Sequence, residues 1–417
     1  MNRVRLWLPH VAALVSLVIF TPYSSAQTYT WNLSGSGDWD TTTPNWVGAG
    51  TTWVNSNTSQ AVISALTPTT ITLTENITAN TITTAGGSSL ILETNNNSTL
   101  TLAGTGAGFL VGASSNVNVE ITGSVGLTKS GNGGLTINTA ATYTGATIIS
   151  AGSIAVTTNN ALPTATDLTV ASGALFSLVI GASQQVAGLA GAGTVQTLAG
   201  TSTLTLSGTS GGTDFTGVLQ NSSGTLSVTK TGSGTQTLSG TNTYTGATTI
   251  EGGTLEVNGS LGNTAIAVNG GTLTGSGSVS GAVTFTSGGG LGADLAGAFD
   301  QTDIDSTSTH VVIGSTLTLA DGTVFRLFGD ENLTQGQSYS VVLANTASYG
   351  GDPTSFSVVS GSGTFSAFTG TSLSYDGGSN NLTLTFTPVP EPATVFGLGT
   401  LALGVFGGVR RRVVRKA

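Results

Sequence analysis

Cysteine is absent from this sequence of 417 residues, and histidine occurs only twice, as His10 and His310. Without disulfides, stability must come from a packed core and from hydrogen bonds. Thiol nucleophiles are excluded, and a His-based zinc site lacks sufficient ligands. A Ser-His-Asp system would depend on His310 alone, because His10 lies in an N-terminal apolar segment. We therefore expect no enzyme and no cofactor.

Charged residues are also scarce, at 7% of the chain, against roughly 25% in ordinary globular proteins. Residues 27–387 contain eighteen acidic residues but only three basic ones, Lys129, Lys230 and Arg326. This balance excludes nucleic acid as a partner, because phosphate contacts need a basic patch. The thinly spread negative charge favours solubility.

Glycine, by contrast, is abundant, with 62 residues, and apolar residues make up 38% of the chain. The apolar residues alternate with Thr and Ser, which gives each short segment one face to bury and indicates β-strands rather than disorder. Strands are expected at Thr70–Thr74, Leu90–Leu92, Thr99–Leu102, Thr203–Leu206, Val283–Phe285, Val311–Ile313, Thr316–Leu319, Tyr339–Leu343 and Leu382–Phe386.

The N-terminus has the pattern of a secretory signal peptide. Arg3 and Arg5 precede a mostly apolar run at 6–20, and small residues lead up to Ala26. Cleavage is expected between Ala26 and Gln27, which makes residues 1–26 the signal peptide. A buried N-terminal helix is the alternative, but the rest of the chain has almost no helical pattern.

The C-terminus combines a short Pro-rich motif, an apolar run at Ala393–Val409 and a basic tail. The apolar run predicts a marginal transmembrane helix, and the basic tail predicts that the chain before it lies outside the inner membrane. The residues of this signal are Pro390, Glu391 and Pro392 in the motif and Arg410, Arg411 and Arg412 in the tail.

Two segments, residues 127–156 and 228–257, are identical at fourteen of thirty positions without gaps. Both contain T-K-x-G-x-G, then Y-T-G-A-T, then glycine before a short alternating segment. In the second segment Ile250, Leu255 and Val257 are expected to face inward, with Gly252-Gly253 forming a corner. The match indicates an internal repeat.

These segments resemble the autotransporter-associated β-strand repeat, and the C-terminal pattern resembles a PEP-CTERM sorting signal. The resemblance implies an exported protein, processed by an exosortase-type enzyme and sorted to the cell envelope, outer surface or extracellular matrix of a Gram-negative-type bacterium. Trp31, Trp39 and Trp46, with the Asn and Gly residues around them, resemble the start of such proteins.

The predicted fold is all-β: a right-handed parallel β-helix (solenoid), with the C-terminal transmembrane helix. Coils of roughly 20 residues would make the 101-residue spacing of the repeats about five coils, which would put both repeats on one side of the stack. A β-sandwich array is the alternative. The expected domains are the signal peptide at 1–26, the β-helix with its repeats at 27–264, a C-terminal β region capping the solenoid at 265–387, and the sorting signal at 388–417.

A weak calcium site is the main candidate for chemistry, formed by Asp300, Asp303 and Asp305. The segment lacks the Gly and distal Glu of an EF-hand loop, so a polar turn is favoured over a metal site or a catalytic site. His310 is interpreted as an ordinary strand residue.

The repeats and the N-terminus offer further candidates for binding. Lys129 and Lys230 are expected to lie along the coil surface, rather than to contact a sugar or partner. Tyr143 and Tyr244 are interpreted as corner or stacking residues and not as ligand platforms. The Trp-rich start predicts an aromatic cap over the first coil, with sugar stacking as the alternative.

Together these patterns predict an exported, non-enzymatic structural or adhesive protein of the cell surface or extracellular matrix. Its expected partners are the exosortase-type enzyme, exopolysaccharide or neighbouring surface proteins, and the inner membrane before processing. The alternative is a carbohydrate-binding or polysaccharide-degrading β-helix protein.

Overall fold

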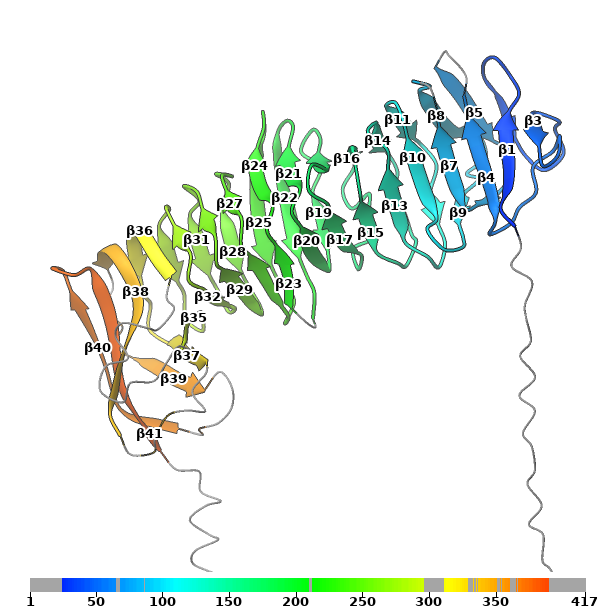
Figure 1. Ribbon diagram of the computed structural model, residues 1–417. Coiled ribbons are helices and arrows are strands. Elements are labelled where there is room, and N and C mark those ends of the chain that lie inside the picture. The colour runs from blue at the N-terminus through cyan, green and yellow to red at the C-terminus, as the bar shows by residue number, and fades with distance from the viewer. Residues whose placement is uncertain are drawn as a thin grey trace, which may run out of the picture.

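The computed structural model describes residues 25–389, except for 65–67, 86, 210–211, 296–310, 329–332, 334, 336, 351–352, 354, 361–364 and 366. The described residues form an all-β solenoid of about 11 turns, which confirms the predicted parallel β-helix. It is an elongated, gently curved rod with β1 (Gln27–Trp31) near one end and β41 (Asn381–Val389) at the other (Figure 1). In the part of the chain described, no helix is long and apolar enough to cross a membrane.

The rod has three faces, and most coils contribute one strand to each. Face 1 is a 16-stranded sheet, parallel except at its first pair. Its strands, in spatial order, are β3 (Trp46–Gly48), β1 (Gln27–Trp31), β4 (Ser59–Ile63), β7 (Thr81–Thr84), β10 (Gly108–Val111), β13 (Leu127–Ser130), β15 (Thr147–Ile149), β17 (Asp167–Val170), β20 (Gly188–Gly191), β23 (Gly212–Phe215), β26 (Thr235–Leu238), β29 (Thr254–Val257), β32 (Thr272–Thr274), β35 (Gly290–Asp294), β37 (Thr323–Phe328) and β39 (Phe356–Ser360).

Face 2 begins as a nine-stranded parallel sheet and continues with three short strands. It contains β2 (Gly37–Trp39), β5 (Thr69–Leu73), β8 (Leu90–Thr94), β11 (Ser115–Val117), β14 (Gly134–Ile137), β16 (Ser153–Val156), β18 (Leu175–Leu178), β21 (Thr194–Thr197) and β24 (Val218–Asn221), then β27 (Thr241–Asn242), β30 (Ser260–Leu261) and β33 (Ser278–Val279).

Face 3 has no strand between β12 and β19, and irregular backbone forms this side of the coils there. It contains β6 (Ile77–Ala79), β9 (Leu100–Leu102), β12 (Ile121–Thr122), β19 (Gln184–Val186), β22 (Thr201–Leu206), β25 (Thr225–Lys230), β28 (Thr248–Ile250), β31 (Ile266–Val268) and β34 (Val283–Phe285). Strand β36 (Val311–Thr318) pairs with β33 through its first half and with β34 through its second, so it closes both faces.

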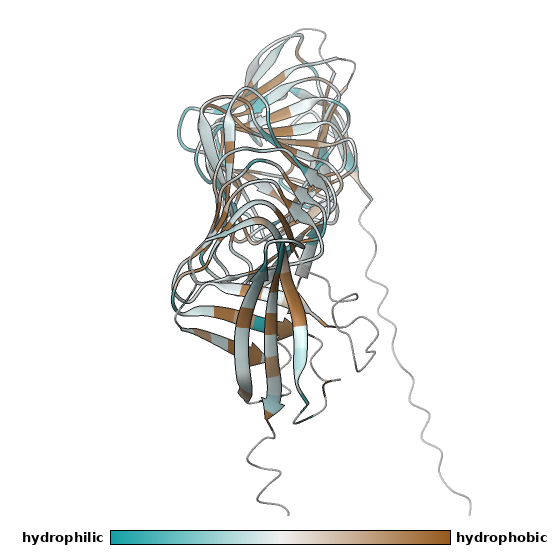
Figure 2. Cartoon of the chain, turned by 90° about the vertical axis from the view of Figure 1, so that its left-hand side faces the viewer, coloured by the Kyte–Doolittle hydropathy of each residue, from teal (hydrophilic) through white to brown (hydrophobic). Residues whose placement is uncertain are grey.

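Hydrophobic and hydrophilic residues alternate along many strands, as the colours of Figure 2 show, and the buried hydrophobic ones form the core. Ile250, Leu255 and Val257 are buried, whereas Glu251 is exposed, as the alternation predicts. All the expected segments form strands, but Val311–Ile313 and Thr316–Leu319 belong to the single strand β36, and the strand expected at Tyr339–Leu343 extends to Gly350. The corner is confirmed as well, because Gly253 adopts a φ of 61°, in the left-handed region that favours glycine.

The two repeats do not lie on the same side of the rod, contrary to the expectation from their spacing. The first begins with β13 on face 1, and the second begins with β25 on face 3. Followed through five successive strand pairs on face 1, the position of Leu127 corresponds to Gln236. In the sequence match between the repeats, Leu127 instead corresponds to Val228, eight residues earlier. Coil length is the reason: successive partners on face 1 lie 18 to 27 residues apart between Gln60 and Gly290.

The N-terminal end is closed by aromatic residues and by β3, which pairs antiparallel with β1. Trp31, Trp39, Trp46 and Trp53 are at most 4% exposed, and their ring centroids pack 4.8–5.1 Å apart. The predicted aromatic cap is therefore confirmed, and stacking of sugar rings on these buried faces is excluded.

The C-terminal end changes from parallel to antiparallel pairing. Strand β38 (Tyr339–Gly350) continues the parallel order against β36, but its other edge pairs antiparallel with β41 (Asn381–Val389). Strand β40 (Ala367–Asp376) then pairs antiparallel with β41. These three long strands project at the end of the rod (Figure 1). Antiparallel pairs therefore occur at both ends of the described rod.

Candidate functional site: repeat cores and a groove on face 1

The repeat lysines point into the rod, which corrects the prediction that they lie on its surface. Lys129 is fully buried, and its Nζ donates to the carbonyls of Ser130 at 2.9 Å, Gly131 at 2.8 Å and Ala151 at 3.1 Å. The ammonium thus caps backbone carbonyls at a corner of two successive coils. Those acceptors replace part of its lost hydration, which a buried charge requires.

Lys230 repeats this arrangement one face away. It is 2% exposed, and its Nζ donates to the carbonyl of Gly232 and, at 3.5 Å, to that of Gly252. A Cβ at Gly253 would lie 2.8 Å from Nζ, and one at Gly152 would lie 2.9 Å from Nζ of Lys129. The glycines of the repeat therefore make room for the lysine as well as for the turn.

The repeat tyrosines are also internal. The Tyr143 hydroxyl hydrogen-bonds Thr147 Oγ1 at 2.5 Å, Thr147 contacts Thr166 Oγ1 at 2.9 Å, and Thr166 donates to the Gly145 carbonyl at 3.0 Å. Tyr244 forms the equivalent chain through Thr248, Thr264 and the Gly246 carbonyl. The Y-T-G-A-T motif therefore encodes a buried hydroxyl network that joins two coils, and both tyrosines are corner residues, as predicted.

Burial has opposite effects on the pKa values of these two residue types, because it disfavours the charged form of each. The pKa of Lys129 falls to about 8, and that of Lys230 is also lowered. The pKa of Tyr143 and of Tyr244 is raised well above its usual range, although the bond to Thr147 or Thr248 opposes the shift.

The lysine shift predicts that the repeat gains stability at alkaline pH. Between about pH 8 and about pH 10.4 the unfolded chain holds the Lys129 proton more strongly than the folded chain, so the free energy of unfolding rises with pH. Relative to Lys129→Met, the native protein should become more stable between about pH 7.5 and about pH 9.5. Urea titrations of both proteins at several pH values measure this. A difference that is constant or shrinks with pH would contradict it.

Several predicted site residues lie outside the described residues. These are the calcium candidates Asp300, Asp303 and Asp305, together with His310, Pro390, Glu391, Pro392, Arg410, Arg411 and Arg412. Within the described ranges, no three His, Cys, Asp or Glu side chains gather as a metal site would require. At the predicted signal-peptide cleavage site, β1 starts at Gln27, directly after Ala26.

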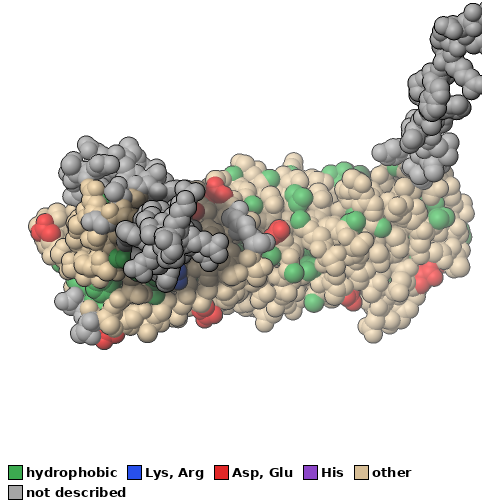
Figure 3. All heavy atoms as spheres, turned by 90° about the horizontal axis from the view of Figure 1, so that it is seen from below, with side chains coloured by type: hydrophobic (Ala, Val, Ile, Leu, Met, Phe, Trp, Pro, Cys, Tyr) green, Lys and Arg blue, Asp and Glu red, His purple; other side chains and the backbone are tan. Residues whose placement is uncertain are grey.

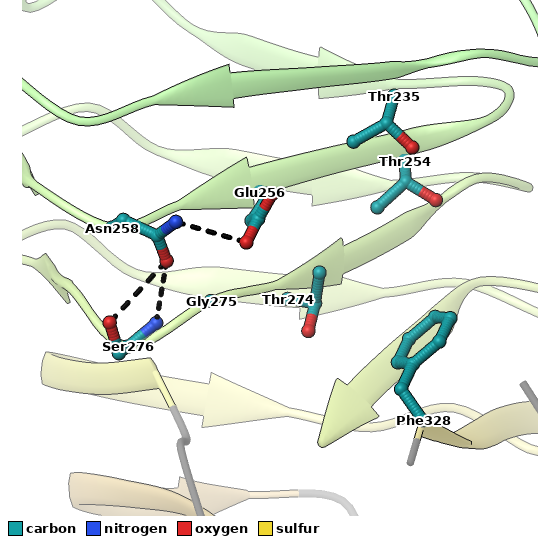
Figure 4. Close-up of a pocket in the computed structure, with 8 residues that line it drawn as sticks. All are labelled: Thr235, Thr254, Glu256, Asn258, Thr274, Gly275, Ser276 and Phe328. Carbon is teal, nitrogen blue, oxygen red and sulfur yellow. Dashed lines mark hydrogen bonds between the residues drawn. The ribbon is translucent and has the colours of Figure 1, made fainter. Parts of the chain in front are cut away.

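A groove on face 1, near the C-terminal end of the rod, is a candidate binding site that the sequence did not suggest. Its volume is about 430 Å³, within the range of roughly 300–1,000 Å³ typical of small-molecule sites. Figure 4 shows its lining from β26, β29, β32 and β37. The lining residues are Thr235, Thr254, Glu256, Asn258, Thr274, Gly275, Ser276 and Phe328.

Hydrogen bonds fix the polar side of the groove. Glu256 accepts from Thr237 Oγ1 at 2.8 Å through one carboxylate oxygen and from Asn258 Nδ2 at 2.9 Å through the other. The Asn258 carbonyl oxygen in turn accepts from the Ser276 backbone N–H at 3.2 Å and from its hydroxyl at 3.4 Å. The carboxylate is therefore held in one orientation while keeping acceptor capacity for a ligand.

The rod surface around the groove carries few charges. Figure 3 shows single acidic side chains scattered over one face, with one basic side chain toward the C-terminal end and separate hydrophobic side chains between them. Of the three basic residues between 27 and 387, two are the buried lysines, and the third, Arg326, lies on β37 two residues before Phe328 and pairs with Gly292. The site thus offers hydroxyl, amide and carboxylate groups, with no cluster of cations to hold an anion.

The fold and repeat cores agree with the family comparisons. The passenger-associated-transport-repeat model matches residues 127–156 and 228–257, and the PEP-CTERM protein-sorting motif model matches residues 388–413. No curated protein and no solved structure matches the chain.

The structure shows a β-solenoid, and the two matched motifs indicate export to the envelope or surface of a Gram-negative bacterium. The chain is a surface protein that carries passenger-associated-transport repeats and a PEP-CTERM sorting motif, which implies export that depends on an exosortase-type enzyme.

Proposed function

We propose that this protein is a non-enzymatic structural or adhesive component of the cell surface or extracellular matrix. The observation that carries the proposal is the closed rod itself. The characteristic lysines and tyrosines of both repeats make internal contacts. The lysines donate to backbone carbonyls, and the tyrosines hydrogen-bond to threonines that join two coils. The outer faces are left with short polar side chains, chiefly Thr, Ser and Asn, suited to many weak contacts along a rigid surface.

The ends of the folded body support the proposed processing sites. Strand β1 begins at Gln27 and β41 ends at Val389, one residue before Pro390. Removal of residues 1–26 and of the chain beyond the sorting motif would therefore leave every described strand intact. We propose cleavage after Ala26 and near Pro390–Pro392, which releases the rod to the envelope or matrix.

Mass spectrometry of the exported protein tests this proposal. In a host with the matching exosortase, we expect a mature chain that starts at Gln27 and lacks Arg410–Arg412. The apolar run of seventeen residues spans about 25 Å as a helix, less than the roughly 30 Å hydrocarbon core, so it would make a weak permanent anchor. A surface protein that retains its end at Ala417 would show that the tail anchors the chain.

The groove on face 1 favours carbohydrate binding as a second function. Polysaccharide hydrolysis is a weaker candidate, because glycosidases generally use two carboxyl groups across the scissile bond. Among the described residues that line the groove, Glu256 is the single carboxylate. Incubation with neutral and acidic polysaccharides should therefore give no new reducing ends.

A further inference from the structure

The floor of the groove is formed by glycines, which have no side chain to fill it. On β35, Gly290 and Gly292 occupy the outward positions that Thr272 and Thr274 fill on β32. A Cβ at Gly292 would lie 2.8 Å from Phe328 Cε2 and 2.8 Å from Thr274 Oγ1. The phenyl ring therefore lies against the bare backbone of Gly292, and together they form one wall of the groove.

Phe328 and Glu256 come from strands three positions apart on face 1, with the glycine strand between them. Figure 4 shows the ring of Phe328 on one side of the groove and the hydrogen-bonded Glu256–Asn258–Ser276 group on the other. The site thus combines an aromatic wall, an oriented carboxylate and amide, and a row of threonine hydroxyls.

We propose that this groove binds a neutral glycan, which rests on the adhesive function proposed above and names its ligand class. The apolar face of a sugar ring would pack on Phe328, and its hydroxyls would donate to Glu256 and exchange hydrogen bonds with Asn258 and the threonines. Hydroxyls suit a carboxylate that already accepts two bonds and has lone pairs left.

Charge selects against the acidic alternatives. Glu256 is the only charged side chain among the described lining residues, whereas the cation Arg326 lies on the strand of Phe328 but outside the lining. A uronate or sulfated sugar beside Glu256 would therefore bring like charges together. The ligand class is therefore a neutral polysaccharide rather than an acidic one.

Binding of soluble polysaccharides to the mature exported protein tests the proposal. The probes are a β-glucan, a galactomannan and a dextran, with alginate as the acidic comparison, measured by affinity electrophoresis and calorimetry. We expect at least one neutral polymer to bind and alginate not to. Phe328→Leu and Glu256→Gln should each weaken that binding by about tenfold, the equivalent of one lost contact of roughly 1.4 kcal/mol, whereas Phe328→Tyr should retain it.

Glu93→Gln is the matched control, because Glu93 is an exposed carboxylate on face 2, far from the groove. It should leave binding unchanged, and circular dichroism should show the same fold in all four variants. Absence of binding to every neutral polymer, or binding that Phe328→Leu and Glu256→Gln both leave intact, would overturn the proposal. Export and C-terminal processing of these variants report separately on the surface function, which would stand even if the groove assignment fell.

Discussion

Leu255→Asp is expected to destabilise the rod by at least about 4 kcal/mol. Leu255 is fully buried on β29, in register between Gln236 of the preceding coil and Leu273 of the next. A carboxylate there would lose its hydration without gaining a cationic partner, because the repeat cation Lys230 already donates to glycine carbonyls, one of them, Gly252, at the corner between β28 and β29. Urea unfolding followed by circular dichroism measures the loss.

Thr249→Asp provides the comparison, since Thr249 faces outward from β28 and is partly exposed. Its effect should stay within about 0.5 kcal/mol, as surface substitutions usually do. Equal losses for the two variants would mean that the inside and outside of this coil are wrongly assigned.

Gly253→Ala should destabilise by about 3 kcal/mol or more, although it adds a single methyl group. Gly253 has a φ of 61°, and a Cβ would lie 2.2 Å from the Gly232 carbonyl oxygen and 2.4 Å from that of Gly234. Both oxygens are backbone atoms of the adjacent coil, so the clash forces the coils apart. The displacement also opens the carbonyl cage around Lys230. Thermal unfolding should show the lowered midpoint.

Gly173→Ala separates the steric clash from backbone strain. Gly173 has a φ of 79°, yet a Cβ there meets no atom within 4 Å. Its substitution should cost only the left-handed strain, about 1 kcal/mol. Losses of similar size at both glycines would show that contact between coils adds nothing at Gly253.

The strands and their buried faces followed from the sequence because alternation is a local property. Ile250, Leu255 and Val257 point inward whatever the coil length, and the glycine pair beside them turns the chain. The face on which a repeat starts was not predictable in this way. It depends on the sum of five unequal coil lengths, and insertions within loops change that sum without altering any strand pattern.

The interior position of Lys129 and Lys230 was missed because charged residues are rarely buried without a charged partner. Here backbone carbonyls at glycine corners take the place of that partner. A signal was present in the composition: the exported region has only two lysines, and each occurs at the same place in the repeat, just before a glycine-rich corner.

The groove could not be predicted either, because its two walls come from distant parts of the chain. Phe328 follows Glu256 by 72 residues, and the two are brought near only by stacking of β29, β32, β35 and β37. No local sequence pattern distinguishes Gly290 and Gly292, which form the floor of the groove, from glycines that form turns.

The one-face offset between the two repeats bears on how such rods lengthen in evolution. The same thirty-residue unit fits when it begins on face 1 and when it begins on face 3. A gene duplication therefore need not encode a whole number of turns to be accommodated. In both copies, placed one face apart, the same corner of lysine, tyrosine and glycine forms.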